Sequence, residues 1–308
     1  MTEPPRFQRT LARPCEFEPG AGLRSGGRIR LRALPAPPDS GIRFRRIDLP
    51  GAPEIPALLR SIDAAALDLR TALACGEARV ELVEHALAAC LALALDNVVF
   101  ELDGPELPIY DGSAAPYAEA LAAAGANEQR SPRRFLRLSR PVAWCQGGVE
   151  LVALPSGELH AAFLGEFPTP SIGRQEAAHA IDAKGFRREL APARTFCSLS
   201  EAAALARMGE IRGAGDIAAV LDGQGQIAEE AFRRAAGDVA CALIFGEAGP
   251  VNGALRFANE PARHKLVDLL GDACLLGRPL LARIIAVKSG HRSHAAFFRK
   301  ILEEESRS

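Results

Sequence analysis

Residues 259–272, NEPARHKLVDLLGD, have the spacing of an α-helix with an unusual polar face. At about 3.6 residues per turn, His264, Asp268 and Asp272 follow one another along one stripe, and apolar residues occupy the opposite side. A histidine with a carboxylate one turn away can bring two ligands to one metal ion. A solvated face without function is the commoner explanation of such a stripe taken alone. A metal site therefore needs a third ligand, a base and an acid from elsewhere in the chain.

The composition is that of an ordinary globular protein. The chain has 308 residues, of which 48% are hydrophobic and 24% charged, which suggests about two domains. The formal net charge of -1 gives no electrostatic basis for binding nucleic acid. The N-terminal residues contain no apolar signal segment, and the seven cysteines are scattered without a C-x-x-C pair. We therefore expect a cytoplasmic protein with reduced thiols, no transmembrane segment and no nucleic-acid partner.

Strand and helix signals follow one another in both halves. Residues 28–48 alternate apolar and polar side chains around a turn, which predicts a β-hairpin; residues 82–94 predict a buried helix, and 97–102 a strand. An Ala-rich helix is expected at Ala118–Ala124. In the second half, strands are expected near 135–142, 149–154, 159–163 and 283–289, with helices before the last.

Because strands precede helices in each half, the sequence predicts an α+β fold of two domains, each with two layers. The polar segment 127–134 is the expected linker between a first domain of residues 1–126 and a second domain of residues 135–308. Residues 209–249, rich in Ala and Gly, have the least definite pattern.

Two further segments place polar residues beside apolar ones. Glu84 and His85 open the apolar helix, where a buried charged pair is costly unless it is paired or bound. His291 follows the apolar strand IIAVKSG, at a turn where side chains often reach a cleft. A solvated pair at a helix start and a surface histidine are the alternative explanations.

A zinc hydrolase needs three ligands, a general base and a proton donor. The candidate ligands are His85, His264 and Asp268. The candidate general base is Glu84, and the candidate proton donor is His291. Asp272 is placed to orient a catalytic histidine. The spacing permits this arrangement without requiring it.

Five stretches carry longer motifs. They are VEHALAA at 83–89, DNVVFELDGPELPIYDGSAAPY at 96–117, ARTF at 193–196, RHKLVDLLGD at 263–272 and AVKSGH at 286–291. In this order the chain resembles the UDP-3-O-acyl-N-acetylglucosamine deacetylase family, the zinc enzymes of the committed step in lipid A synthesis. The resemblance implies two similar α+β domains that face each other with the active site between them. It also implies a UDP-linked, acylated amino sugar as the small-molecule substrate.

The resemblance implies a role for each site residue. Zinc would bind His85, His264 and Asp268, and Glu84 would be the base that activates water. His291, supported by Asp272, would protonate the departing amine. Thr195 would hydrogen-bond the oxyanion, and Lys265 and Phe196 would contact the substrate.

The chain departs from the family pattern at other positions. Arg24 stands where the family has a histidine, Leu82 where it commonly has Ser or Thr, and Ala240 where it has an aspartate. Residues 209–249 carry an insertion, and Arg292, Ser293, His294 and Ala295 follow His291 where the family has Ala-Leu-Asn-His. These departures concern substrate positioning and turnover, since none is among the metal ligands.

We interpret the chain as a zinc-dependent amide hydrolase that removes acetate from UDP-3-O-acyl-N-acetylglucosamine, and we expect a monomer. One alternative is a divergent paralogue that deacetylates another N-acetyl sugar. The other is a non-catalytic homologue that binds a nucleotide sugar. The presence of both Glu84 and His291 argues against the non-catalytic alternative.

Overall fold

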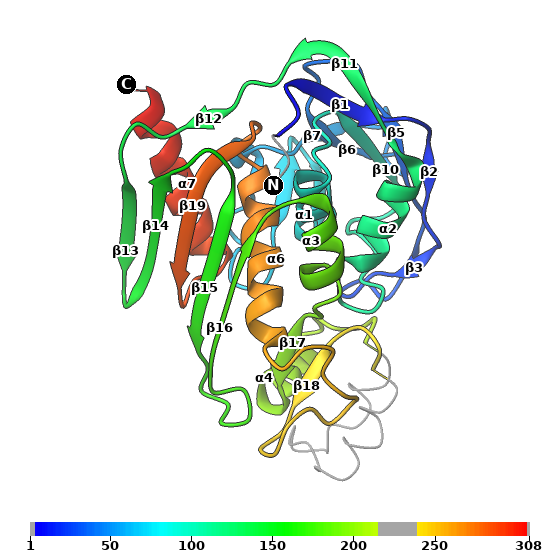
Figure 1. The fold of residues 1–308 in the computed structure, drawn as a ribbon. Helices are drawn as coiled ribbons and strands as arrows, with labels where there is room; N and C mark the ends of the chain where they lie inside the picture. Colours follow the sequence, from blue (N-terminus) through cyan, green and yellow to red (C-terminus); the bar gives the residue numbers. More distant parts are fainter. Residues whose placement is uncertain (1–3, 215–238, 307–308) are drawn as a thin grey trace.

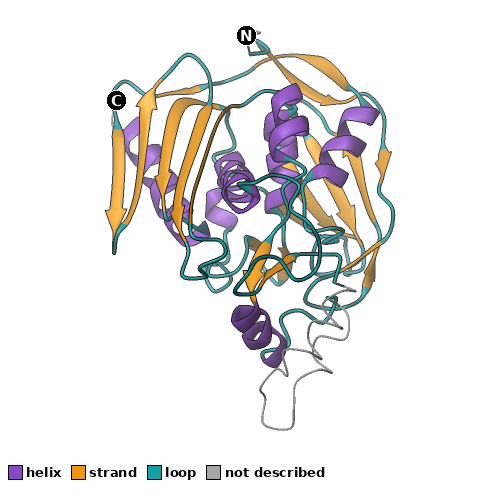
Figure 2. Cartoon of the chain, turned by 60° about the horizontal axis from the view of Figure 1, so that its bottom comes forward, coloured by secondary structure: helices purple, strands orange, loops and turns teal. Residues whose placement is uncertain are grey.

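Two mixed β-sheets lie on either side of a central group of helices in this α+β fold (Figures 1 and 2). The structure is a computed structural model and describes residues 4–214 and 239–306. Within these residues, no helix combines the length and the apolar character that crossing a bilayer requires.

The first sheet has the strand order β2-β5-β10-β6-β7. Its strands are β2 (Cys15–Glu16), β5 (Leu31–Pro35), β6 (Ile42–Arg46), β7 (Glu54–Pro56) and β10 (Val98–Leu102). The hairpin predicted over residues 28–48 is wrong, because β10 lies between β5 and β6, antiparallel to the first and parallel to the second. All five residues of β10 are buried, as in the middle of a sheet covered on both faces. The alternation of apolar and polar residues in β5 and β6 indicates that each strand has one buried face. It does not specify which strand lies next to it.

Two helices and several strand pairs complete the first half. The predicted buried helix and Ala-rich helix are confirmed as α1 (Glu84–Ala92) and α2 (Ala115–Ala124). The shorter elements are β1 (Phe7–Leu11), β3 (Gly20–Ala21), β4 (Arg28–Ile29), η1 (Leu59–Ser61), β8 (Ala72–Cys75), β9 (Ala78–Glu81) and β11 (Ala126–Pro132). Most of the segment predicted as a linker, 127–134, belongs to β11, which pairs with β1. The connection between the halves is therefore held by a strand pair.

The second sheet has the order β13-β14-β19-β15-β16, and β12 also pairs with β19. Its strands are β12 (Leu136–Arg137), β13 (Val142–Gln146), β14 (Val149–Pro155), β15 (His160–Glu166), β16 (Arg174–Ala180) and β19 (Leu280–Val287). The sequence did not predict β16. Here β19 lies between antiparallel β14 and parallel β15, which is the arrangement of β10 between β5 and β6.

The remaining elements lie between or beside the sheets. They are α3 (Ala183–Gly185), η2 (Phe186–Leu190), β17 (Phe196–Ser198), α4 (Leu199–Arg207), β18 (Leu243–Phe245), α6 (Glu260–Cys274) and α7 (His291–Ser306). Helix α6 packs against α1 at Gly271, where an added Cβ would lie 2.2 Å from the carbonyl oxygen of Glu84. The absence of a side chain at Gly271 thus lets α1 and α6, which carry most of the candidate site, approach closely.

Candidate metal centre

Helices α1 and α6 bring three metal-ligating side chains together. His85 lies in the first turn of α1, while His264 and Asp268 lie one turn apart on α6. One donor atom from each residue lies within 4.8 Å of the donor atoms of the other two, and all three side chains are buried. The sequence placed His264 and Asp268 on one stripe, and the tertiary structure adds His85 to them.

The chemistry of this donor group fits a metal ion. The Nδ1 of His264 donates to the carbonyl oxygen of Ala193 at 3.0 Å, which leaves its Nε2, 3.4 Å from Asp268 Oδ1, as the free donor atom. Burial, with the neighbouring His264, lowers the pKa of His85 to about 3, so the ring is neutral and its lone pair is available. Two neutral imidazoles and one carboxylate are the ligand type of catalytic sites that keep a position open.

Lys265 supports the charge of Asp268. Burial raises the pKa of Asp268, but the nearby Lys265 and His264 outweigh it and hold that pKa well below its ordinary value. The Nζ of Lys265 donates to Asp268 Oδ2 at 2.7 Å, while Oδ1 faces His264. Asp268 is therefore an anion whose second oxygen is already occupied.

Glu84 lies beside this group and is almost fully buried. The backbone N–H of Thr71 donates to its Oε2 at 3.3 Å. Burial raises the pKa of Glu84 to about 7, against the opposing charge of His291. A carboxyl group with a pKa near neutrality has the property expected of a general base.

His291 stands at the start of α7 and pairs with Asp272 of α6. Its Nδ1 donates to Asp272 Oδ2 at 2.7 Å, and Thr71 Oγ1 donates to Asp272 Oδ1 at 2.5 Å. Burial lowers the pKa of His291, but Asp272 raises it more strongly, to about 9. His291 is thus a cation near pH 7, with its Nε2–H directed away from Asp272. No sequence signal distinguished Thr71, which comes from a loop of the first half.

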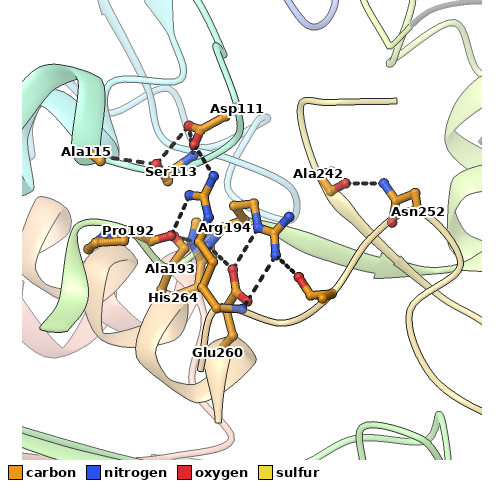
Figure 3. A network of polar contacts seen from close by, with 12 residues as sticks. Asp111, Ser113, Ala115, Pro192, Ala193, Arg194, Ala242, Asn252, Glu260 and His264 are labelled. Atoms are coloured by element: carbon orange, nitrogen blue, oxygen red, sulfur yellow. Dashed lines mark hydrogen bonds and ion pairs between the residues drawn. The ribbon is translucent and has the colours of Figure 1, made fainter. Parts of the chain in front are cut away.

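The turn at residues 193–195 is anchored by the buried carboxylate of Glu260 (Figure 3). Glu260 accepts two hydrogen bonds from Arg194, one from the backbone N–H at 3.0 Å and one from the side-chain Nε at 2.8 Å. It accepts a third from the backbone N–H of Arg256 at 2.6 Å. The next residue, Thr195, donates its N–H to the carbonyl oxygen of Gly112 at 2.7 Å. The carbonyl group of Ala193 in this turn accepts the hydrogen bond from His264. The same turn therefore positions both His264 and Thr195. The sequence reasoning missed Glu260.

A cavity of about 550 Å³ connects these groups. The candidate residues that line it are Glu84, His85, Thr195, Phe196, His264, Lys265, Asp268 and His291. Asp272 is absent from this lining, which agrees with its position behind His291. Apolar side chains from both halves, including Leu67 and Trp144, form other parts of the wall. An open, partly apolar cavity beside a buried polar floor suits an amphiphilic ligand.

The departures from the family pattern contribute no atom to the metal group. Arg24 forms ion pairs of 3.1 Å with Glu81 and with Glu210, outside the cavity. Leu82 lines the cavity with a φ of 58°, a left-handed conformation that is strained in leucine. Ala240 is exposed, and the part of the predicted insertion at residues 215–238 lies outside the described residues.

The family model described as UDP-3-O-acyl N-acetylglycosamine deacetylase matches residues 8–237 and 234–303. A UDP-3-O-acyl-N-acetylglucosamine deacetylase of Chlamydia pneumoniae is 37% identical over 97% of this chain and 98% of its own length. The enzyme of the same name from Solibacter usitatus is 36% identical over 98% of this chain and 93% of its own. The bifunctional enzyme LpxC/FabZ of Chlorobaculum tepidum is 39% identical over 98% of this chain, which spans 65% of that longer protein.

Proposed function

Since the chain belongs to the UDP-3-O-acyl N-acetylglycosamine deacetylase family, whose members are amide hydrolases of lipid A biosynthesis, we propose that its own reaction takes place at a zinc ion held by His85, His264 and Asp268. The observation that carries this proposal is the convergence of three buried donors on the floor of a cavity that Glu84 and His291 also line. The substrate is a UDP-linked, acylated N-acetylglucosamine, and the products are acetate and a free amine.

A zinc ion held by His85, His264 and Asp268 would supply a Lewis acid for the amide carbonyl and for a nearby water. Glu84 is the general base: its carboxylate takes a proton from the attacking water. Thr71 occupies Glu84 Oε2 through a backbone N–H, so Oε1 is the oxygen that remains for this proton. The raised pKa of Glu84 makes the carboxylate basic enough for the transfer.

His291 is the general acid. Its Nδ1–H is held by Asp272, so the proton on Nε2 is the one available to the cavity. This proton passes to the departing nitrogen as the amide C–N bond breaks, which releases an amine instead of an unstable amide anion. Asp272 fixes the ring and stabilises its positive charge without contacting the substrate.

Three residues of the cavity wall complete the site. The Thr195 hydroxyl donates to the carbonyl oxygen as negative charge develops on it. Lys265 offers a cation to anionic parts of the substrate, and Phe196 offers an apolar surface whose ring centre lies 6.3 Å from that of His264. In this proposal residues 1–126 and 135–308 are two similar domains joined by 127–134, in a monomeric cytoplasmic enzyme. The seven cysteines, all free of disulfides, are consistent with a reducing compartment.

Turnover by zinc-loaded protein tests the proposal. UDP-3-O-acyl-N-acetylglucosamine substrates of increasing acyl length are compared with an N-acetyl sugar that lacks UDP, and the deacetylated product is detected by mass spectrometry. We expect turnover that requires UDP and has an optimum of acyl length. Each buried methylene contributes about 0.8 kcal/mol, so a chain shorter by four methylenes should bind roughly two hundredfold more weakly. Turnover that depends on neither UDP nor the acyl chain would favour the divergent paralogue. Absence of turnover with every substrate would favour the non-catalytic homologue.

A further inference from the structure

His294 is a second histidine on the carboxylate that supports His291. It lies in the first turn of α7 and is fully buried. Its Nδ1 is 2.7 Å from Asp272 Oδ2, the same oxygen that the Nδ1 of His291 contacts at 2.7 Å. Its Nε2 is 2.9 Å from the hydroxyl oxygen of Ser289. We propose that His294 is a positioning residue for the deacetylation, which holds Asp272 in the orientation that aligns His291 with the substrate.

The hydrogen bonds assign the proton positions. An ionised carboxylate can only accept, so both Nδ1 atoms carry hydrogen and donate to Asp272 Oδ2. Burial lowers the pKa of His294, so its ring is neutral and Nε2 has a free lone pair. The Ser289 hydroxyl donates to that lone pair. Both ring nitrogens of His294 are thus in use, and its orientation and tautomer are fixed.

This arrangement explains how Asp272 is held. Its Oδ1 accepts from Thr71, and its Oδ2 accepts from two imidazoles on α7. Without His294, the donors left to the carboxylate among the described residues would be Thr71 and His291, the group that Asp272 has to orient. An orienting group needs supports of its own, because loosely held catalytic groups lose rate. The inference deepens the proposed function and rests on it, since His291 is the proton donor there.

The same three residues also admit a different explanation. Asp272, His291 and His294 each offer a donor atom within 4.8 Å of the other two, which is close enough for a second metal ion. The two short N···O distances to one carboxylate oxygen favour hydrogen bonds, because each Nδ1 already has that oxygen as its acceptor. Metal stoichiometry separates the two explanations. We expect one metal ion per chain in wild-type protein, and a second ion lost on His294→Leu would overturn the proposal.

A double-mutant cycle with Asp272→Asn tests the positioning role. His294→Leu removes the Nδ1–H donor and keeps an apolar side chain in the buried position. We expect kcat to fall about 10- to 100-fold, with KM and zinc content unchanged. In the Asp272→Asn background the same change should have almost no further effect, because His294 acts through Asp272. His294→Gln, which retains an N–H donor, should recover part of the rate. Equal losses in both backgrounds would indicate a merely structural role and overturn the proposal.

Two further measurements keep the test independent of folding and of turnover. If His294→Leu does not fold, Ser289→Ala takes its place: it frees Nε2, and we expect a several-fold loss of kcat that again disappears with Asp272→Asn. The imidazole N–H resonances of histidine-labelled protein report the two hydrogen bonds directly. We expect the His291 Nδ1–H resonance to shift in His294→Leu, and an unchanged resonance would overturn the inference. Absence of turnover in wild-type protein would instead overturn the proposed function.

The basic limb of the pH profile gives an additional readout. The groups that face His291 come from four parts of the chain: Asp268, Asp272 and His264 on α6, Glu84 and His85 on α1, Thr71 in the first half and His294 on α7. Loss of the His294 donor changes how Asp272 meets His291 and leaves the other groups in place. The limb assigned to His291 should therefore move in His294→Leu. The control is His160→Gln, in which the limb should stay in place. His160 is a half-buried histidine on β15, its Nε2 lies 3.6 Å from Glu158, and it lies outside the cavity. An unmoved limb in His294→Leu would count against the proposal.

Discussion

Replacing Gly271 by alanine tests whether the contact between α1 and α6 determines the metal geometry. An added Cβ at Gly271 would lie 2.2 Å from the carbonyl oxygen of Glu84 and 2.8 Å from its Cα. These neighbours are backbone atoms, so they cannot rotate away as the end of a flexible side chain could. The two helices must separate to accept the methyl group.

The expected displacement exceeds what the site tolerates. Ordinary contact with a Cβ begins at 3.4 Å, so the backbones have to move apart by about 1 Å. His85 lies on α1 and the other two ligands on α6, so the shift falls between ligands whose metal distances tolerate only about 0.2 Å. We expect weaker zinc binding and a loss of activity on the order of 10²-fold. Glycine to alanine stabilises an exposed helix by about 1 kcal/mol, but overpacking here should destabilise by about 1–3 kcal/mol.

Urea unfolding, chelator competition for zinc, and kcat/KM measure the three effects. The control is Gly157→Ala, since Gly157 is exposed and an added Cβ there meets nothing within 4 Å. The control should match wild-type protein in all three measurements. If Gly271→Ala is as stable as wild-type protein and binds zinc equally tightly, the close approach of α1 and α6 does not set the site, and the reasoning is refuted.

Four other outcomes are expected. Alanine in place of any one of the three ligands should sharply reduce zinc content by elemental analysis, because a three-ligand site loses a donor; full occupancy in all three variants would contradict the assignment. Glu84→Gln should keep zinc and lower kcat roughly 10²- to 10⁴-fold, whereas normal turnover per zinc would place the base elsewhere. The rate should rise with pH as Glu84 loses its proton and fall as His291 does. Burial places the pKa of Glu84 at about 7, and Asp272 places the pKa of His291 at about 9. A bound cation lowers both pKa values, so a kcat/KM that still rises through pH 9 would exclude His291 as the acid. Glu260→Gln should lower the free energy of unfolding by about 3 kcal/mol, because it breaks a buried ion pair with Arg194; an unchanged urea midpoint would show that this pair does not anchor the turn.

Helix α1 and strand β10 show how much of the fold could be read from sequence. Their runs of apolar residues predicted a buried helix and a strand, and the structure confirms both. The complete burial of β10 is a finding of the structure. The partner of a strand is a different question. The strands β5 and β6 are close in sequence, but the fully apolar β10 fills the place between them. Burial on both faces marks a central strand, and no short-range pattern states which strands flank it.

Some of the site residues could be predicted from neighbouring residues in the sequence, whereas others depend on contacts between distant segments. Glu84 and His85 are adjacent, and the stripe on α6 follows from helix periodicity alone. Thr71 carried no sequence signal, since its role comes from a hydrogen bond to a residue 201 positions away. His294 carried a weak one: it lies three residues after His291, which is one turn of a helix.

The sequence by itself therefore determined the identity of the chemical groups and their grouping within each helix, because side chains one turn apart share a face whatever the rest of the chain does. Only the tertiary structure decided that α1 meets α6 at Gly271, that Thr71 and two histidines converge on Asp272, and that Glu260 anchors the turn before Thr195. These contacts join segments far apart in the chain. Their distances are set by how buried faces pack against one another, and this packing depends on all the elements at once.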